Sequence, residues 1–259
     1  MKVVILAGGY GTRLGEETEN VPKPLIEIGG KPILWHIMKI YSHYGFNDFI
    51  ICLGYKGNLI KEFFHHQYLY SSNLTIDLAN NQIDYIQNQV EPWKVHLIDT
   101  GLKTMTGGRI KRLKKYLAGE SFMLTYGDGV GDINIPGLIK YHQTQKKIVT
   151  LTSVQPLGRY GAILFGKDTN RVLKFQEKPK GDNSWINGGF YVFEPEIFNY
   201  IASDKTHLEL EPLERLAQKN QISAYRHTGF WKSMDTLRDK IELENLWEKK
   251  KALWKIWKN

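Results

Sequence analysis

Cysteine is almost absent from this chain of 259 residues, which contains only Cys52, inside an apolar run. A single cysteine cannot form a disulfide within the chain, so we expect a protein of a reducing compartment, by default the cytoplasm. Uninterrupted apolar stretches are also short, and none approaches the roughly 18 residues that a membrane-spanning helix needs. The first of them ends in glycines too early for a signal peptide. The sequence therefore predicts a cytoplasmic protein that does not cross a membrane.

Several familiar site motifs are missing as well. The glycines at the start of the chain lack the third glycine of a dinucleotide fingerprint, because Leu14 stands in its place. There is no Gly-Lys-Ser or Gly-Lys-Thr triplet of an ATPase-type phosphate loop, and no Gly-x-Ser-x-Gly elbow of a hydrolase. The eight histidines show no His-x-x-x-His spacing, so a zinc site is not expected.

Acidic residues are outnumbered by basic ones, which gives a net charge of +8. Five of the lysines, however, fall in the last eleven residues, where no acid occurs. Trp247, Trp254 and Trp257 follow roughly helical spacing toward this end of the chain, so we expect a helix over 236–259 that docks an aromatic face and leaves its lysines in water. The mild positive charge of the rest fits a small substrate with several phosphates. Nucleic acid is therefore not the favoured partner.

At its start, the chain contains a predicted strand that runs into a glycine loop. Residues 3–6 are apolar and mostly β-branched, as in a buried parallel strand, and three glycines follow within residues 8–11. Such a loop leaves backbone N–H groups free to face a phosphate. Arg13 adds a planar cation beside the loop, and Lys23, between two prolines, adds a cation on a stiff segment. A tight turn with two surface cations is the alternative interpretation.

The order of patterns along the chain predicts a single α/β domain over residues 1–259. Strand and helix patterns alternate through residues 1–66, which favours right-handed crossovers and a parallel sheet. Residues 67–99 interrupt this alternation with an antiparallel hairpin that turns near Asn80. Residues 155–235 carry short strands and turns, and we expect a small β-rich portion there. The proportions of 42% apolar and 24% charged residues are ordinary for a globular protein.

Two aspartates stand where metal ligands are expected. Asp128 follows a strongly apolar strand and Asp235 follows another, which places both at the carboxyl edge of a sheet, where open α/β folds bind ligands. Two carboxylates at such an edge suit Mg²⁺ shared with substrate phosphates. The alternatives are a turn residue for Asp128 and a helix N-cap for Asp235. Asp132 is a weaker candidate ligand.

A second group of polar residues lies in the β-rich portion. Glu177 could accept hydrogen bonds from sugar hydroxyls, and Lys178, stiffened by the following proline, could meet a sugar phosphate. Asn187 offers both a donor and an acceptor, and Gly188 lets the backbone approach a ligand closely. A salt-bridging strand end and a hairpin turn are the alternative interpretations of these two segments.

Taken in order, these motifs are similar to those of the sugar-phosphate nucleotidyltransferases. The shared elements are Leu-Ala-Gly-Gly-x-Gly-Thr-Arg-Leu, then Lys-Pro, Gly-Asp, Glu-Lys-Pro and Asn-Gly-Gly. Further segments resemble the branch of the family that uses CTP and glucose 1-phosphate. They are residues 28–36, 91–93, 105–109, 126–130, 229–231 and 234–239.

This resemblance implies a Rossmann-like, mixed but mostly parallel sheet flanked by helices, and a homo-oligomer such as a hexamer. It implies that CTP and α-D-glucose 1-phosphate give CDP-glucose and pyrophosphate, with Asp128 and Asp235 binding Mg²⁺. The implied catalytic residues are Arg13, Lys23 and Asp128. The implied sugar-phosphate contacts are Tyr126, Glu177, Lys178, Asn187 and Gly188. The implied nucleotide contacts are Leu6, Ala7, Gly8, Gly9, Gly11, Thr12, Arg13, Lys23, Thr104, Arg109 and Gly127.

Such a reaction needs no dedicated general base. The second pKa of a phosphate monoester is about 6, so the attacking oxygen is already anionic at neutral pH. Catalysis then depends on bringing two polyanions into line and neutralising charge at the α-phosphate. Two other hypotheses remain open: a relative that uses dTTP, UTP or another sugar phosphate, and a sensor of nucleotide sugars without turnover.

Overall fold

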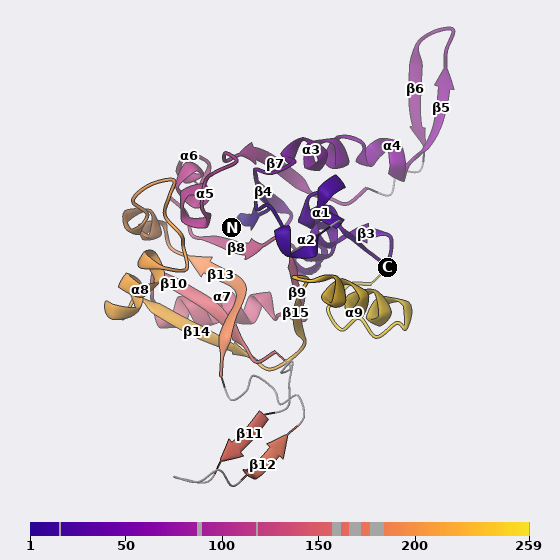
Figure 1. Ribbon diagram of the computed structural model, residues 1–259. Coiled ribbons are helices and arrows are strands. Elements are labelled where there is room, and N and C mark those ends of the chain that lie inside the picture. The colour runs from indigo at the N-terminus through magenta and orange to yellow at the C-terminus, as the bar shows by residue number, and fades with distance from the viewer. Residues whose placement is uncertain are drawn as a thin grey trace.

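The computed structural model describes residues 1–15, 17–86, 90–117, 119–156, 162–165, 172–176 and 184–258. A seven-stranded sheet lies at its centre (Figure 1). In sheet order the strands are β14 (Ile222–His227), β10 (Val149–Val154), β13 (Ile186–Phe193), β8 (Phe122–Tyr126), β1 (Val3–Leu6), β4 (Asp48–Leu53) and β7 (Lys94–Asp99).

Strand direction confirms the expected mixed, mostly parallel sheet. β1 pairs in parallel with both β4 and β8, β4 pairs in parallel with β7, and β10 pairs in parallel with β14. Only β13 is reversed within this sheet, because it is antiparallel to both of its neighbours, β8 and β10. The carboxyl ends of the other strands therefore share one edge, and the beginning of β13 joins them there.

The core has two parts, one on each face of the sheet, as the two-residue period of a strand requires. Val3 and Ile5 of β1 pack on one face against α2 (Ile33–His43). Val4 of the same strand packs on the other face against α5 (Thr106–Arg112). The remaining helices of the described chain are α1 (Glu17–Asn20), α3 (Gly57–His65), α4 (Gln67–Ser71), α6 (Lys114–Leu117), α7 (Ile135–Gln145), α8 (Glu211–Gln218) and α9 (Leu237–Glu248), with 3-10 turns at Thr12–Leu14, Lys23–Leu25 and Pro195–Tyr200.

Two hairpins project from opposite ends of the molecule in Figure 1. One is the expected hairpin, formed by β5 (Asn73–Asp77) and β6 (Gln82–Ile86). The other is formed by β11 (Ala162–Phe165) and β12 (Val172–Gln176). Two more ribbons lie closer to the core: β2 (Glu27–Ile28) pairs with β3 (Lys31–Pro32), and β9 (Gly129–Gly131) pairs with β15 (Trp231–Ser233).

The C-terminal helix is shorter than expected. α9 begins at a capping box formed by Thr236 and Asp239 and ends at Glu248, whereas the sequence pattern predicted helix up to residue 259. The following segment is irregular, yet Trp254 is fully buried and Trp257 nearly so. The aromatic side chains dock on the core as expected, but tertiary packing of the tail, rather than a helical face, places them there.

His36 of α2 lies inside this aromatic cluster. Its Nε2 donates to the carbonyl of Ile28 at 2.8 Å, and its Nδ1 accepts from the indole of Trp254 at 3.3 Å. Trp247 packs against the ring edge-on. Burial lowers the pKa of His36 from 6.5 to about 4, so the ring is neutral in the folded protein at neutral pH.

None of the helices in the described part of the chain is both long enough and apolar enough to span a membrane.

Candidate active site

A cleft of about 1230 Å³ opens along the edge where β1 and β8 end. Apart from the weaker candidate Asp132, every predicted site residue that the structure describes lines this cleft. These are Leu6, Ala7, Gly8, Gly9, Gly11, Thr12, Arg13, Lys23, Thr104, Arg109, Tyr126, Gly127, Asp128, Asn187, Gly188 and Asp235. The other two, Glu177 and Lys178, lie outside the described residues.

The glycine loop leaves β1 at Leu6 and enters the 3-10 turn Thr12–Leu14. Gly11 has a φ of 68°, a left-handed conformation that favours glycine. Within the described chain, the backbone N–H groups of Gly9, Tyr10 and Gly11 have no acceptor. A Cβ added at Gly9 would meet nothing within 4 Å, so this position faces open space. The loop can therefore present N–H groups to an anion in the cleft.

The buried side chain of Arg109 holds the backbone of this loop in place. Its guanidinium donates to the carbonyls of Leu53 and Gly8, both at 2.9 Å, and to the hydroxyl of Thr100 at 2.7 Å. Burial lowers the pKa of Arg109 from its usual value, and these acceptors compensate for part of the lost hydration. The sequence predicted a nucleotide contact for Arg109. In the structure its hydrogen bonds join the ends of β1 and β4, and they fix the position of the loop.

The glycine at position 8 is required by this packing. A Cβ on Gly8 would lie 2.2 Å from Nη1 of Arg109. The arginine cannot easily move aside, because three hydrogen bonds hold its guanidinium in a buried place. Gly8 therefore serves close packing, whereas Gly9 next to it faces the cleft.

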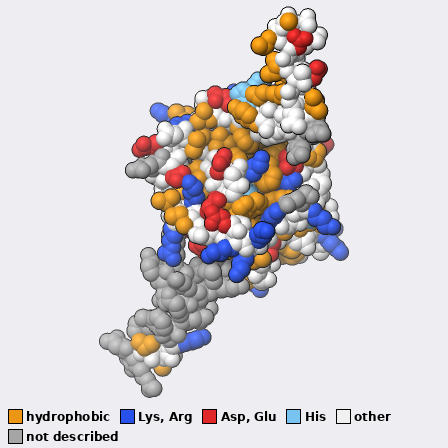
Figure 2. Space-filling view, turned by 90° about the vertical axis from the view of Figure 1, so that its right-hand side faces the viewer, with side chains coloured by type: hydrophobic (Ala, Val, Ile, Leu, Met, Phe, Trp, Pro, Cys, Tyr) orange, Lys and Arg blue, Asp and Glu red, His pale blue; other side chains and the backbone are white. Residues whose placement is uncertain are grey.

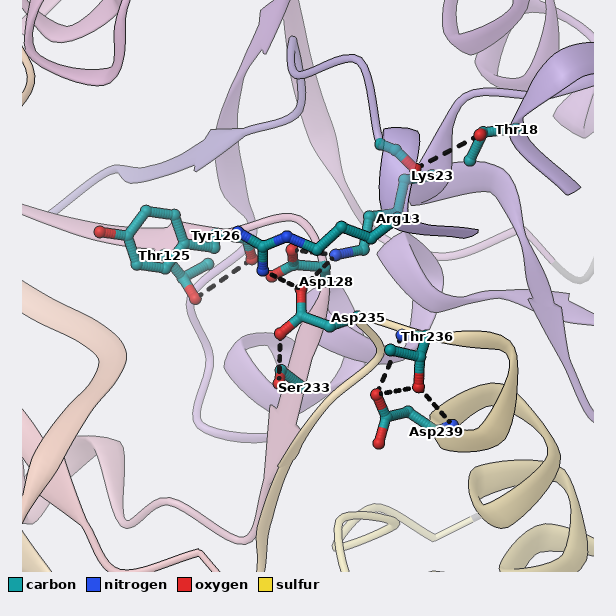
Figure 3. A network of polar contacts seen from close by, with 11 residues as sticks. Arg13, Thr18, Lys23, Thr125, Tyr126, Asp128, Ser233, Asp235, Thr236 and Asp239 are labelled. Atoms are coloured by element: carbon teal, nitrogen blue, oxygen red, sulfur yellow. Dashed lines mark hydrogen bonds and ion pairs between the residues drawn. The ribbon is translucent and has the colours of Figure 1, made fainter. Parts of the chain in front are cut away.

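Lys23 joins the two aspartates predicted as metal ligands (Figure 3). Its Nζ lies 2.7 Å from Oδ2 of Asp128 and 2.8 Å from Oδ1 of Asp235. Burial opposes the positive charge, but the two carboxylates outweigh it, and the pKa of Lys23 is raised above its usual value. Burial likewise opposes the charge of Asp235, but hydrogen bonds from Lys23 and Ser233 lower the pKa of this aspartate. Sequence reasoning assigned Lys23 to phosphates and did not foresee this bridge.

Backbone pairing explains why the two aspartates meet. Gly129 of β9 is the register partner of Ser233 of β15, and the N–H of Met234 donates to the carbonyl of Asp128 at 2.8 Å. Asp128 and Asp235 thus flank one short antiparallel ribbon. Asp132, the weaker candidate, follows the other end of β9, pairs with His227 at 3.0 Å and does not line the cleft.

The two carboxylates fit a magnesium ion. Both already contact one cationic group, Nζ of Lys23, so a single cation can bridge them. Within the described residues, no group of three or more His, Cys, Asp or Glu side chains could hold a metal by itself. Two hard oxygen ligands with room for phosphate oxygens and water match the preference of Mg²⁺. Arg13 lies 3.6 Å from Asp235, and its side chain is 78% exposed, so it is free to reach a ligand in the cleft.

The reversed strand β13 brings Asn187 to the opposite wall of the same cleft. Because β13 runs antiparallel to β8, its first residues lie beside the last residues of β8. The carbonyl of Gly188 accepts from the indole of Trp231 at 2.7 Å. Sequence reasoning gave Trp231 no role, although it lines the cleft. Trp231 begins β15, and the signal available in the sequence was that residues 229–231 resemble a segment of the family.

Comparisons with known proteins agree with this geometry. A family model described as nucleotidyl transferase matches residues 2–249. A glucose-1-phosphate cytidylyltransferase from Salmonella typhi is 54% identical, with 99% of this chain and 100% of the relative covered. A probable glucose-1-phosphate cytidylyltransferase from Bacillus subtilis is 44% identical over the same shares.

Solved structures share the fold of this chain. HddC from Yersinia pseudotuberculosis, complexed with GMP-PN, is similar with a TM-score of 0.69 and 25% identity, covering 95% of this chain and 99% of that one. A UDP-glucose pyrophosphorylase complexed with UDP-glucose has a TM-score of 0.66 at 18% identity, covers 96% of this chain and 98% of its own, and shows the shared fold. The chain therefore belongs to the nucleotidyl transferase family, among its glucose-1-phosphate cytidylyltransferases.

Proposed function

We propose that this enzyme transfers a cytidylyl group from CTP to α-D-glucose 1-phosphate in the cytoplasm, giving CDP-glucose and pyrophosphate. One observation carries the proposal: a glycine loop and the Lys23–Asp128–Asp235 cluster line a single cleft. The full-length relatives at 54% and 44% identity support the choice of CTP and glucose 1-phosphate. The free, buried thiol of Cys52 is in keeping with a reducing compartment.

The triphosphate would lie on the glycine loop. Backbone N–H groups of Gly9 and Gly11 would donate to it, and Arg13 would add a mobile positive charge. Arg109 would act beneath the loop by holding the carbonyl of Gly8, while Thr104 lines the neighbouring wall. This arrangement provides a stiff backbone surface for the anion, with the flexible cation at its edge.

Asp128 and Asp235 would hold Mg²⁺ where Lys23 now bridges them. When bound, the ion supplies positive charge against the negative charge that develops on the reacting phosphates. Lys23 would place a second positive charge beside the ion, and in the folded protein the two carboxylates outweigh burial and raise the pKa of its ammonium. The site thus concentrates positive charge where two polyanions must approach each other.

The sugar phosphate would enter from the side of Asn187 and Gly188, with Glu177 and Lys178 as its further predicted contacts. Its phosphate is largely dianionic above a pKa of about 6, so the oxygen that attacks the α-phosphorus has no proton to lose. The protein has only to align the two substrates. Positioning of this kind lowers a barrier by roughly 7–11 kcal/mol in favourable cases.

A panel assay tests the proposal. Pyrophosphate release is measured for CTP, dTTP and UTP, each with glucose 1-phosphate and with other hexose 1-phosphates. We expect CTP with glucose 1-phosphate to give the highest kcat/KM, and the activity to disappear with chelator and return with Mg²⁺. A higher kcat/KM for dTTP or UTP would reassign the substrate, and binding without pyrophosphate release would support the sensor hypothesis.

We also propose that the chain assembles as a homo-oligomer through the β5–β6 hairpin. An isolated two-stranded hairpin is marginally stable in water, yet this one projects from the molecule with apolar side chains on its surface. Figure 2 shows hydrophobic side chains on the hairpin and on the face beneath it. Ile76 and Ile83, which are cross-strand partners, are 54% and 52% exposed, and Leu78 is 89% exposed. A second copy of the chain would cover this surface.

A further inference from the structure

A chain of hydrogen bonds runs behind the wall of the cleft and ends at a residue with no assigned role, Glu209. The Nδ2 of Asn187 bonds the hydroxyl of Tyr191, which lies 3.1 Å from the hydroxyl of Tyr126. The Tyr126 hydroxyl lies 2.6 Å from Oε1 of Glu209. The other carboxylate oxygen of Glu209 accepts from the hydroxyl of Thr106, also at 2.6 Å.

The carboxylate fixes the direction of this chain. A carboxylate only accepts hydrogen bonds, so the hydroxyl of Tyr126 donates to Glu209 and its oxygen is left to accept from Tyr191. The hydroxyl of Tyr191 then uses its one proton in the hydrogen bond that it donates to Tyr126, and its oxygen accepts a hydrogen bond from Nδ2 of Asn187. Burial, with Tyr191 and Glu209 nearby, raises the pKa of Tyr126, so the donor keeps its proton.

At the other end, the direction of the chain and the N–H of Gly189 favour the same orientation of the Asn187 amide. Its Nδ2 points toward Tyr191, and its Oδ1 accepts from the N–H of Gly189 at 2.9 Å. A flipped amide would place an oxygen against a hydroxyl that has no proton to give. The remaining amide proton and oxygen lone pair of Asn187 therefore have one defined arrangement toward the cleft.

Glu209 touches both walls of the cleft without lining it. Tyr126 ends β8, two residues before Asp128, and Thr106 begins α5, next to the segment that contains Thr104. Figure 3 shows the Tyr126 hydroxyl directed away from the Lys23–Asp128–Asp235 cluster.

We propose that Glu209 is a positioning residue that sets the orientation of Asn187 through Tyr126 and Tyr191, and so tunes recognition of the sugar phosphate. The inference rests on the proposed function, which places the sugar phosphate at Asn187. Glu209 also holds Thr106 on the nucleotide side, so its charge couples the two halves of the cleft. A hydroxyl or phosphate oxygen of the sugar phosphate would hydrogen-bond to this amide, whose donor and acceptor positions are fixed.

The test uses Tyr191→Phe, because Tyr191 is buried and lies outside the cleft lining. This change removes the middle hydroxyl of the chain and leaves the ring in place. We expect the KM for glucose 1-phosphate to rise about fivefold to tenfold, the effect of one lost hydrogen bond, and the KM for CTP to stay unchanged. Glu209→Gln should raise both KM values, because an amide places a donor against Tyr126 or Thr106.

Tyr225→Phe is the matched control, since Tyr225 lies on β14 and its hydroxyl is outside the chain of hydrogen bonds. We expect it to leave both KM values unchanged. Thermal melting checks that each variant is folded, and Tyr191→Phe keeps the test decisive if Glu209→Gln unfolds.

Unchanged KM for glucose 1-phosphate in folded Tyr191→Phe, or equal rises for both substrates, would overturn the inference while leaving the proposed function intact. A wild-type protein that forms no CDP-glucose would overturn both.

Discussion

Lys23 and Asp128 stand 105 positions apart in the chain, yet the ammonium of one lies 2.7 Å from the carboxylate of the other. The same ammonium reaches Asp235, so one lysine contacts both carboxylates of the proposed metal site and offsets part of their negative charge. A divalent cation at these oxygens would compete with Lys23 for them. The site thus holds its positive charge in place before any ligand arrives.

Loss of Lys23 should abolish most of the activity without unfolding the protein. We expect Lys23→Ala to lower turnover with CTP about a hundredfold or more, the usual cost of one group that stabilises charge in the transition state. Steady-state kinetics and circular dichroism measure the two effects. Lys114→Ala, at an exposed position of α6, is the control and should retain full turnover. Near-normal turnover of Lys23→Ala would remove the lysine from the mechanism.

Asp128 should be needed for metal binding as well as turnover. We expect Asp128→Asn to lower turnover about a hundredfold or more and to weaken Mn²⁺ binding in the presence of CTP, read by electron paramagnetic resonance. Asp132→Asn is the matched control, because Asp132 lies near the same strand but pairs with His227 outside the cleft. Equal Mn²⁺ affinity in the two variants would contradict the assignment.

Adjacent glycines of the loop should respond differently to alanine. At Gly8 the new Cβ would lie 2.2 Å from Nη1 of Arg109, and we expect Gly8→Ala to lower the free energy of unfolding by about 1–3 kcal/mol. At Gly9 the new Cβ would face open space, so Gly9→Ala should keep the wild-type stability and change only nucleotide binding. Denaturant unfolding of both variants measures the difference. Equal stability would show that Arg109 moves aside without cost.

Stability should fall in mild acid because of His36. Its pKa in the folded protein, about 4, lies below the unfolded value of 6.5. As the pH falls, His36 therefore binds a proton in the unfolded chain before it does so in the folded protein. The contribution of neutral His36 to the free energy of unfolding is complete above pH 6.5 and is lost as the pH falls toward 4. The shift corresponds to about 3 kcal/mol. Urea unfolding across this range, compared with His36→Gln, isolates the effect, and identical slopes in the two proteins would refute it.

A charge on the β5–β6 hairpin should dissociate the proposed oligomer. We expect Ile76→Lys to reduce the mass measured by light scattering, because a lysine at a buried contact between copies would be desolvated without a partner. Ile241→Lys, equally exposed on α9, is the control and should leave the mass unchanged. A wild-type monomer, or an oligomer that survives Ile76→Lys, would exclude this surface as the contact.

The sequence was informative where local chemistry alone decides the structure. The apolar strand before the glycine loop and the strand before Asp128 predicted side chains at one sheet edge, and these residues do line one cleft. Asp235 lines the same cleft, but the strand before it, β15, pairs with β9 outside the seven-stranded sheet, so the expected position at the edge of that sheet was wrong for Asp235. Strand ends can be placed from sequence because parallel strands deliver their carboxyl ends to the same side. The β5–β6 hairpin was equally predictable, since the asparagine turn lies between two runs of strand-forming residues.

Contacts between distant segments could not be predicted in this way. Nothing in the sequence near Lys23 indicates that its partners are Asp128 and Asp235. Nor does the pattern around Arg109 show that its acceptors are the carbonyls of Gly8 and Leu53. The prediction for the tail was wrong for a related reason. The helical spacing of the tryptophans predicted a helix, but the packing of Trp254 against the core determines the path of the backbone after Glu248.

The docked tail has a practical consequence for work with this enzyme. The Trp254 ring stacks on Phe230 with ring centres 5.5 Å apart, and Phe230 directly precedes β15, the ribbon strand that leads to Asp235. Ending the chain before Trp254 would remove the side chain that packs on Phe230 at the start of that ribbon. We expect a protein shortened in this way to turn over poorly because the packing behind Asp235 is lost, although every residue that lines the cleft is still present.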